Sequence, residues 1–263
     1  MIKICNLSCG YAGHEVIKNV SLNINEGDFV GIIGKNGVGK TTFLKSLAGL
    51  IKPFSGNVFI DDTDIYKIKK SVLAKKIAFM PQTMQFDFPF SVKDFIMFGR
   101  YPYMNMFKYA SAEDFSIVRE VMNFTGVAEF AERNISELSG GEKQKVLMAQ
   151  TLSQRTDIIA LDEPTSHLDI GSQSSIFKIL RMLNEKYNKT VITTIHDLNL
   201  AGEFCSRLVL IDKGNIFNSG TCDEVLNYRD IENVYDAKVV VKTNPVSQKP
   251  VVIPIYADSY KKK

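Results

Sequence analysis

The sequence predicts an α/β fold with a mostly parallel sheet core, an N-terminal antiparallel β region and a helical insertion. Short apolar runs alternate with helix-length segments over most of the 263 residues, as in proteins whose parallel sheet is covered by helices. The alternation stops between residues 83 and 154, where helical patterns follow one another. With 45% hydrophobic and 23% charged residues, the chain can bury the core of one large domain that carries such an insertion.

The candidate strands are short runs that are apolar nearly throughout. Such runs are typical of strands covered on both faces, whereas half-exposed strands alternate between apolar and polar residues. The runs comprise residues 29–33, 57–60, 77–80, 158–161, 191–195 and 208–211. We therefore expect all of them in the central sheet.

Helical patterns occupy the segments between these runs. Residues 41–50 and 172–187 follow core strands, and the second of these segments places Ile176, Ile179, Leu180 and Leu183 on one face. The insertion contains helical patterns at residues 92–99, 112–124 and 142–152, with Phe95 and Phe98 expected in its core. Residues 1–82 and 155–235 are thus expected to form an α/β core, and residues 83–154 a helical subdomain.

Residues 236–263 are expected to form a C-terminal extension. Valine and isoleucine alternate with polar residues between positions 239 and 256, and Pro245, Pro250 and Pro254 interrupt the pattern. Because proline cannot donate a hydrogen bond to a sheet, this pattern favours short edge strands. The lysines at 261–263 are expected to be solvated.

The composition excludes several classes of protein. The 32 basic and 29 acidic residues leave a formal net charge of +3, too small to indicate a nucleic-acid partner, and we expect none. No apolar stretch approaches the roughly 20 residues of a membrane span, and the N-terminus lacks the apolar core of a secretory signal, so we expect a soluble, cytoplasmic protein. Cys5, Cys9, Cys205 and Cys222 contain no C-x-x-C pair and are expected to be free thiols.

A glycine-rich loop carries the first chemical signal. Directly after the apolar run 29–33, the chain reads G-x-x-x-x-G-K-T and enters a helix. In this context the backbone N–H groups converge on phosphate oxygens, lysine adds a mobile charge and threonine can hold Mg²⁺. The predicted nucleotide-binding residues of this loop are Gly34, Lys35, Asn36, Gly37, Val38, Gly39, Lys40, Thr41 and the following Thr42.

Two adjacent carboxylates, Asp162 and Glu163, follow the apolar run 158–161. In a parallel sheet, ligands bind at the carboxyl ends of the strands. Asp162 is therefore placed to reach Mg²⁺ and Glu163 to polarise a water molecule. Seen alone, the pair is also compatible with solvated acids that end a strand.

Further motifs make the sequence resemble that of an ABC-type ATPase subunit from about Met1 to Ile231. The string L-S-G-G-E-K-Q begins at Leu138, Gln82 follows a strand, S-H-L-D follows the acid pair, and His196 follows the run 191–195. These motifs occur in the order of that family. The resemblance implies a P-loop, RecA-like core that binds ATP and Mg²⁺, and a homodimer that holds two nucleotides between its subunits.

The resemblance also implies roles for single residues. Tyr11 matches the aromatic residue that stacks on adenine, Gln82 the residue that touches metal and attacking water, and His196 the residue that contacts the γ-phosphate. Glu163 matches the general base, and Thr41, Gln82 and Asp162 match the metal ligands. The signature residues expected to reach the partner's nucleotide are Ser139, Gly140, Gly141 and Glu142, and Asp169 is expected at the dimer seam.

Some of these residues also allow simpler interpretations. Ser139 and Glu142 spell a helix capping box, which is compatible with an anion site because a capped helix N-terminus binds anions. Taken singly, Gln82 is typical of a surface amide, His196 of a structural histidine and Tyr11 of ordinary packing. The sequence departs from the common family signature at Glu142 and Lys145, where Gln and Arg are frequent, although Glu is also a variant among importers.

The aromatic residues indicate a subgroup of the family. Nine of the 27 residues from 83 to 109 are aromatic, against 10% of the whole chain. The stretch G-R-Y-P-Y at 99–103 and H-D-L-N-L-A at 196–201 resemble ATPases of importers for iron–siderophore complexes, haem and cobalamin. We favour iron–siderophore uptake, with haem, cobalamin or metal-ion import as alternatives.

The resemblance implies partners that the subgroup shares. These are an integral membrane permease, expected to dock near residues 86–109, and indirectly an extracytoplasmic substrate-binding protein. The chain is then expected on the cytoplasmic side of the cell membrane as a peripheral subunit. Residues Phe86, Phe88 and Phe90 alternate around Pro89 in a loop and suit such a docking surface.

Other classes of P-loop protein explain fewer of these motifs. A non-transport ABC ATPase that acts on chromosomes or repairs DNA would carry a long coiled-coil insertion with heptads, which this chain lacks. A translation factor of the family normally has two cassettes in one chain. A GTPase or small-molecule kinase would leave the signature at 138–144 unexplained, and an exporter commonly has fused membrane-spanning segments.

Overall fold

The computed structural model of the chain describes residues 1–84, 89–104, 110–166 and 168–256. Its strands are β1 (Ile2–Tyr11), β2 (His14–Ile24), β3 (Phe29–Ile33), β4 (Ser55–Ile60), β5 (Thr63–Asp64), β6 (Ile77–Met80), β7 (Ile158–Asp162), β8 (Thr190–Thr194), β9 (Arg207–Asp212), β10 (Asn215–Gly220), β11 (Val239–Thr243) and β12 (Pro250–Pro254). Its α-helices are α1 (Lys40–Leu47), α2 (Lys70–Leu73), α3 (Val92–Met97), α4 (Ala112–Thr125), α5 (Gly140–Ser153), α6 (Ile170–Tyr187), α7 (Leu198–Phe204), α8 (Cys222–Val225) and α9 (Tyr228–Tyr235). Short 3₁₀ helices are η1 (Phe98–Tyr103), η2 (Ala128–Phe130) and η3 (Ile135–Glu137).

Within the described residues, these strands form a central sheet, an N-terminal sheet and a C-terminal hairpin. The central sheet has the order β10-β9-β3-β8-β7-β6, in which β9, β3, β8, β7 and β6 run parallel and β10 is antiparallel. The N-terminal sheet, β2-β1-β4-β5, is antiparallel throughout. The predicted α/β class, with a mostly parallel core and an N-terminal antiparallel region, is confirmed.

One predicted core strand lies in the other sheet. The run 57–60 was expected in the parallel sheet, but it belongs to β4, which pairs antiparallel with β1. Along this strand Val58 and Ile60 are buried, whereas Phe59 between them is only partly buried. The expectation was wrong because a run of three apolar residues is too short to distinguish a strand covered on both faces from one covered on a single face. The remaining predicted strands lie within one or two residues of β3, β6, β7, β8 and β9.

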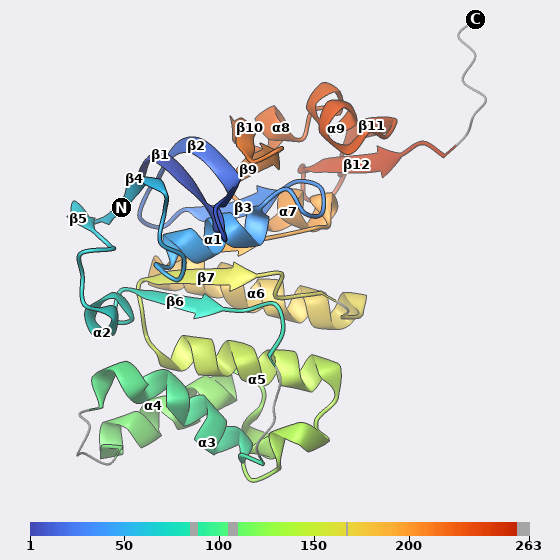
Figure 1. Cartoon of the computed structure of the whole chain (residues 1–263). Coiled ribbons are helices and arrows are strands. Elements are labelled where there is room, and N and C mark those ends of the chain that lie inside the picture. Colours follow the sequence, from blue (N-terminus) through green and yellow to red (C-terminus); the bar gives the residue numbers. More distant parts are fainter. Residues whose placement is uncertain (85–88, 105–109, 167, 257–263) are drawn as a thin grey trace, which may run out of the picture.

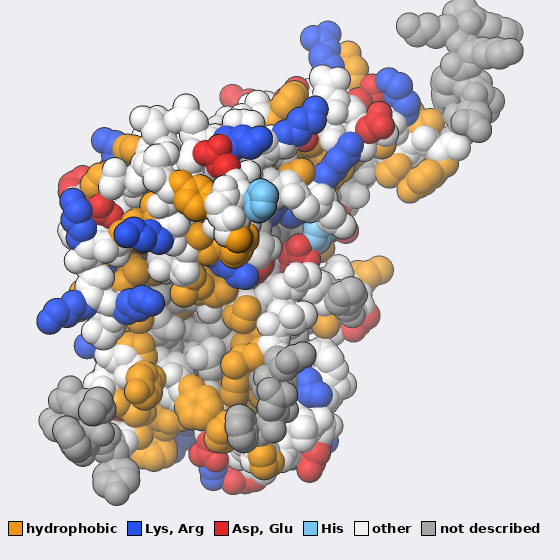
Figure 2. All heavy atoms as spheres, viewed as in Figure 1, with side chains coloured by type: hydrophobic (Ala, Val, Ile, Leu, Met, Phe, Trp, Pro, Cys, Tyr) orange, Lys and Arg blue, Asp and Glu red, His pale blue; other side chains and the backbone are white. Residues whose placement is uncertain are grey.

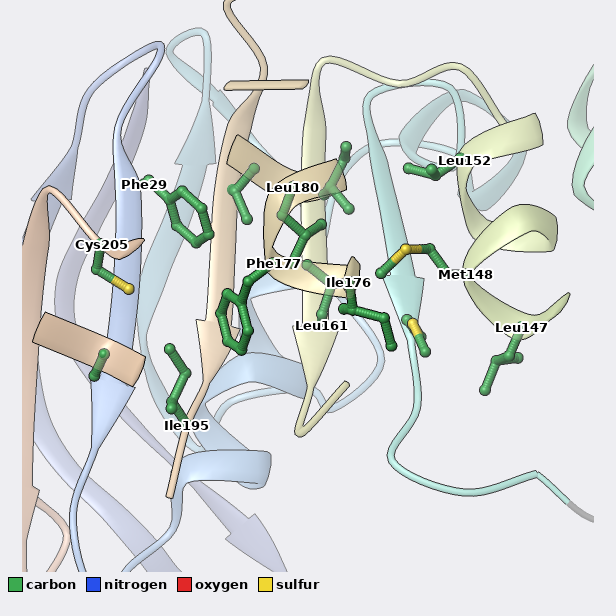
Figure 3. Packing of buried hydrophobic residues seen from close by; sticks show 14 of the residues in the cluster. Phe29, Leu147, Met148, Leu152, Leu161, Ile176, Phe177, Leu180, Ile195 and Cys205 are labelled. Carbon is green, nitrogen blue, oxygen red and sulfur yellow. The ribbon is translucent and has the colours of Figure 1, made fainter. Parts of the chain in front are cut away.

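Two hydrophobic cores lie on opposite faces of the central sheet. On one face α1 packs between the central sheet and the N-terminal sheet, with Phe43, Leu44 and Leu47 fully buried (Figure 1). On the other face α6 and α5 cover the sheet through Ile176, Phe177, Leu180, Leu147 and Met148, as Figure 3 shows. The predicted apolar face of residues 172–187 is thereby confirmed.

The helices α3, η1, α4 and α5 form the predicted insertion and lie beyond β6 in Figure 1. The predicted helix 92–99 changes to a 3₁₀ helix at Phe98. Pro102 explains the change, because it lacks the N–H that an α-helix would direct at the carbonyl of Phe98. Phe95 is buried as expected, but Phe98 is 44% exposed and packs edge-on against Phe90 and Phe95, so its placement in the core was wrong.

A buried ion pair ties the insertion together. Nε of Arg100 donates to a carboxylate oxygen of Asp114 at 2.9 Å, and another guanidinium nitrogen donates to the carbonyl of Ser153 at 2.8 Å. Both charged side chains are at most 10% exposed. The next residue, Gln154, donates to the carbonyl of Ile77 at 3.1 Å, which attaches the insertion to β6.

The C-terminal part consists of α8, α9 and the antiparallel β11–β12 hairpin, so the short strands expected there are confirmed. Pro250 and Pro254 lie at the ends of β12, where a missing N–H costs least. The tail at 261–263 lies outside the described residues. The four cysteines are free thiols, as predicted. None of the helices within the described ranges is long and apolar enough to span a bilayer.

Candidate active site

The glycine-rich loop connects β3 to α1, as its sequence context predicts. Gly34 has a φ of 148°, and a Cβ there would lie 2.3 Å from the carbonyl oxygen of Ile211 on β9. Gly39 has a φ of 107° and caps α1 without a side chain. These positions require glycine because one has no room for a side chain and both have positive φ. The loop therefore brings the N-terminus of α1 to the carboxyl edge of the sheet.

Lys40 lies at the start of α1 and is 5% exposed. Its Nζ donates to the carbonyls of Gly34 at 2.9 Å and Lys35 at 3.0 Å, so the charge is held over the loop. The pKa of Lys40 is lowered, because burial outweighs the opposing effect of the charges of Glu163 and Asp162. A phosphate chain on the loop would supply negative charge to this partly desolvated ammonium group.

Thr41 and Asp162 bring two oxygen ligands together. The hydroxyl of Thr41 donates to Oδ1 of Asp162 at 2.9 Å, and the hydroxyl of Thr194 donates to the same oxygen at 2.8 Å. A hydroxyl and a carboxylate next to a phosphate-binding loop are the donor set that Mg²⁺ prefers, since this ion usually combines one or two protein oxygens with substrate phosphates and water. The residues present therefore fit Mg²⁺.

Glu163 lies at the centre of a network of polar side chains. Its Oε2 accepts a hydrogen bond from Nε2 of Gln82 at 2.7 Å, and its Oε1 contacts Nε2 of His196. The backbone N–H of Glu163 donates to the hydroxyl of Thr194 at 2.8 Å. Glu163 has a φ of 48°, in the left-handed region, and its side chain is 11% exposed. The sharp turn after β7 thus aims both acids at the same edge of the sheet.

These residues surround a cavity of about 810 Å³. Its lining comes from β2, from the loop and the start of α1, from the ends of β6, β7 and β8, and from the starts of α6 and α7. The lining residues are Val16, Asn36, Gly37, Gly39, Lys40, Thr41, Thr42, Gln82, Glu163, Thr165, Ser166, Gln173, Thr194, Ile195, His196, Asp197 and Leu200. Six of the predicted loop residues therefore meet Gln82, Glu163 and His196 at one place.

Other predicted residues do not line this cavity. Asp162 is 2% exposed and lies behind Thr41, to which it is hydrogen-bonded. Tyr11 ends β1, pairs with His14 and is 49% exposed, so adenine stacking on it stays a prediction. The remaining predicted residues outside the lining are Gly34, Lys35, Val38, Ser139, Gly140, Gly141, Glu142 and Asp169.

The signature residues form the exposed N-terminus of α5. The hydroxyl of Ser139 accepts from the N–H of Glu142 at 3.4 Å, and Oε2 of Glu142 accepts from the N–H of Ser139 at 2.7 Å. These hydrogen bonds lower the pKa of Glu142. The capping box predicted from the sequence is confirmed. Asp169 caps α6 differently, since its carboxylate accepts both the backbone N–H of Ser172 at 3.0 Å and its hydroxyl at 2.7 Å. The residue after Asp169, Ile170, is 86% exposed.

Sequence reasoning missed Thr194, whose hydroxyl holds Asp162 and Glu163 together. A threonine inside an apolar run is typical of a β-strand and carries no catalytic signal of its own. Its position at the end of the predicted strand beside the acid pair could have identified it. Gln173 and Val16 were missed as well, because they reach the cavity only through the packing of α6 and β2.

Comparisons with known proteins agree with this geometry. The sequence pattern that defines the ABC transporter family matches residues 17–166. A siderophore transport system ATP-binding protein of Bacillus subtilis is 38% identical over 94% of this chain and 90% of its own length. A cobalamin import ATP-binding protein of Halobacterium salinarum is 34% identical over 97% of this chain. The chain spans 63% of the length of that relative, which is less than two thirds.

Solved structures show the same fold. A metal-chelate type ABC transporter in an inward-facing conformation has a TM-score of 0.85 and 25% identity, with 97% of each chain covered. A dimeric, post-hydrolysis ATP-binding cassette bound to ADP and Pi has a TM-score of 0.75 and 30% identity, over 84% of this chain and 99% of that chain. Together with the motifs, these matches establish that the chain belongs to the ABC transporter family and is one of its ATP-binding proteins.

Proposed function

We propose that this chain is the ATP-hydrolysing subunit of an ABC importer, which closes as a homodimer on two Mg·ATP and drives uptake through a separate permease. The observation that carries this proposal is the convergence of Lys40, Thr41, Glu163, Gln82 and His196 on one cavity at the carboxyl edge of the parallel sheet. A loop that binds phosphate, next to a carboxylate that can accept a proton, is the pair of functions that ATP hydrolysis needs.

ATP binding uses the loop and the N-terminus of α1. The triphosphate accepts hydrogen bonds from the loop N–H groups and replaces the carbonyls of Gly34 and Lys35 as the partner of Lys40. When bound, Mg²⁺ is held by Thr41, Asp162 and Gln82 and neutralises negative charge on the phosphates. The adenine is stacked by Tyr11, which extends from the end of β1.

Hydrolysis uses the acid at the end of β7. Glu163 accepts a proton from the water that attacks the γ-phosphorus, while the bond from that phosphorus to the bridging oxygen breaks and ADP leaves. Gln82 and His196 contact the two carboxylate oxygens of Glu163 and so orient the base. His196 also donates to the γ-phosphate. Residues from three strand ends thereby act on one phosphoryl group.

A second copy completes each site. The signature residues lie outside the cavity on the exposed end of α5, which is compatible with their acting on the nucleotide of a partner. Ile170 next to Asp169 is a large hydrophobic residue that is 86% exposed, as expected for a contact at a subunit seam. The dimeric cassette bound to ADP and Pi supports the same arrangement.

A negative charge on Ser139 tests the proposed contact between the signature residues and the nucleotide of the partner subunit. Ser139→Asp keeps a helix-capping side chain but places a carboxylate against the partner's γ-phosphate. In a Glu163→Gln background, we expect ATP to produce a dimer, and we expect the additional Ser139→Asp substitution to leave monomers that are still stabilised by ATP. Gel filtration and thermal melting measure the two effects. Ser116→Asp, on the exposed face of α4, is the control, and an ATP-dependent dimer with Ser139→Asp would contradict the arrangement.

The helical subdomain, residues 83–154, presents aromatic residues to a membrane partner. Figure 2 shows hydrophobic side chains gathered over the part of the molecule that contains α3–α5. Exposed members include Phe90, Phe98, Tyr101 and Tyr103, whereas Phe86, Phe88, Phe107 and Tyr109 lie outside the described residues. This surface docks the permease on the cytoplasmic side of the membrane, and a substrate-binding protein delivers the cargo from the other side.

Iron–siderophore complexes are the proposed cargo. The stretches at 99–103 and 196–201 support the group of importers for iron–siderophore complexes, haem and cobalamin. Within this group, the similarity to a siderophore transport ATP-binding protein favours iron–siderophore complexes. Cobalamin is the alternative cargo that a specific observation supports, because a cobalamin import ATP-binding protein is 34% identical to this chain.

Uptake by intact cells separates these cargoes. Cells that lack this chain are expected to lose uptake of radioactive iron given as a ferric trihydroxamate complex and to keep uptake of radioactive cobalamin. Restoring the wild-type chain should restore iron uptake, whereas restoring Glu163→Gln should not. Loss of cobalamin uptake with unchanged iron uptake would assign the chain to the other cargo.

A further inference from the structure

The C-terminal hairpin is attached to the helix that follows the catalytic histidine. The side-chain amide of Asn199 on α7 accepts from the backbone N–H of Val252 at 2.8 Å and donates to the carbonyl of Val252 at 3.3 Å. This pair of bonds resembles one rung of a β-ladder, with an amide side chain in place of a neighbouring strand. In Figure 1, β12 runs beside α7.

The same residue belongs to the turn that carries His196. The backbone N–H groups of Asn199 and Leu200 donate to Oδ1 of Asp197 at 2.8 and 3.1 Å, so Asp197 caps α7. Asp197 is the neighbour of His196, whose Nε2 contacts Glu163. Only one backbone turn therefore separates the Val252 contact from the side chain that orients the base.

Packing brings the hairpin close to α7 at a second point. A Cβ on Gly202 would lie 2.9 Å from the carbonyl oxygen of Pro250 and 3.0 Å from Cδ1 of Leu226. Contacts this short leave no room for a side chain, and one of the two atoms belongs to the backbone. The hairpin and α7 thus meet through both a polar contact and close packing.

The C-terminal part also approaches the phosphate loop. Tyr235, the last residue of α9, has a buried hydroxyl without a well-formed hydrogen bond in the described part of the chain. Burial raises the pKa of Tyr235 to about 12, and the backbone N–H of Gly34 acts in the opposite direction. The C-terminal part of the chain therefore approaches the phosphate loop at Gly34 as well as α7.

We infer that Asn199 is a positioning residue for the ATPase reaction: through Val252 it uses the C-terminal hairpin to hold α7, and thereby His196, against Glu163. The inference rests on the proposed function, because it assigns His196 and Glu163 to hydrolysis. It gives the extension beyond residue 235 a role in turnover rather than in nucleotide affinity. Within the described residues, the hydrogen bonds of the Asn199 side chain and N–H lead to Val252 and Asp197, whereas the phosphate-binding residues lie on α1 and its preceding loop.

Asn199→Ala in the full chain tests this role. Removing both bonds should lower kcat for ATP hydrolysis by about 3- to 10-fold, the rate equivalent of one weak hydrogen bond, and change KM for ATP by less than about twofold. Asn199→Asp keeps the acceptor for the Val252 N–H but places a carboxylate against the Val252 carbonyl, so partial activity is expected. Gly202→Ala, which forces β12 away from α7 but keeps the amide, should lower kcat in the same way.

Hydrogen exchange tests, without any nucleotide, whether the hairpin holds α7. In Asn199→Ala, the amides of α7 and of Val252 should exchange faster than in the wild type, while those of α1 should not. Asn123→Ala, on the exposed side of α4, is the matched control and should leave exchange and turnover unchanged. Melting temperatures verify that each variant is folded.

The outcomes separate the two proposals. An unchanged kcat in folded Asn199→Ala, a rise in KM that accounts for the whole loss, or unchanged exchange in α7 would overturn the positioning role. If the wild type hydrolyses no ATP, or hydrolyses it independently of Glu163, the proposed function fails instead. The exchange experiment then still decides whether the hairpin holds α7.

Discussion

Glu163→Gln is expected to lower the rate of ATP hydrolysis by about 10² to 10⁴, the usual contribution of a positioned general base. The amide can still accept from Gln82, but it cannot take a proton from water. Because the phosphate-binding loop is untouched, ATP should still bind and should accumulate in a closed dimer. Phosphate release measured at saturating ATP, together with gel filtration of the ATP-bound protein, checks both statements.

Glu185→Gln is a matched control for this substitution. Glu185 lies on α6, is 66% exposed and pairs only loosely with Arg181 at 3.8 Å. Its replacement should leave turnover within about twofold of the wild type, since exposed ion pairs contribute little. Hydrolysis by Glu163→Gln at more than a tenth of the wild-type rate would remove Glu163 from the role of base.

Lys40→Ala is expected to abolish the stabilisation of the protein by ATP. At ATP concentrations about 100 times Kd, binding should stabilise the wild-type fold by about 2.7 kcal/mol, which appears as a higher melting temperature. The variant loses the buried ammonium group that partners the phosphates, so the same ATP concentration should leave its melting temperature nearly unchanged. Thermal melting with and without Mg·ATP measures the difference.

Lys45→Ala separates a lost phosphate contact from a general loss of charge on α1. Lys45 lies in the last turn of the same helix and does not line the cavity. Its replacement can lower the melting temperature without ATP, since a basic residue near a helix C-terminus is stabilising. The increase on adding Mg·ATP should stay at the wild-type value. A full ATP-dependent increase in Lys40→Ala would contradict the role of Lys40.

Much of the fold and of the cavity could be predicted because both depend on local patterns. The run 29–33 followed by a glycine-rich loop fixes β3, the turn and α1 within a few residues, and the apolar run 158–161 fixes where the acids lie. Parallel strands end at a common edge, so the loop, Gln82, Glu163 and His196 could be expected to meet. Each of these signals is local in the sequence, and the parallel order of the strands brings them together.

Two of the features that escaped prediction depend on long-range partners. The sheet that contains residues 57–60 is decided by pairing with β1. The exposure of Phe98, in contrast, has a local cause, the 3₁₀ turn ahead of Pro102. The contact between Asn199 and Val252 joins residues 53 positions apart, and nothing in either local sequence specifies it. Thr194 was missed for a different reason, because its residue type is common in any strand.

The hydroxyl of Thr194 has a consequence for protein engineering. Its O–H donates to the carboxylate of Asp162 and its oxygen accepts from the N–H of Glu163, each at 2.8 Å, so a single hydroxyl group of the adjacent strand sets the spacing of the two acids. Transplanting the acid pair into an unrelated sheet would therefore require transferring the neighbouring strand in register. Without the threonine of that strand, no hydroxyl would hold the two grafted acids at this spacing.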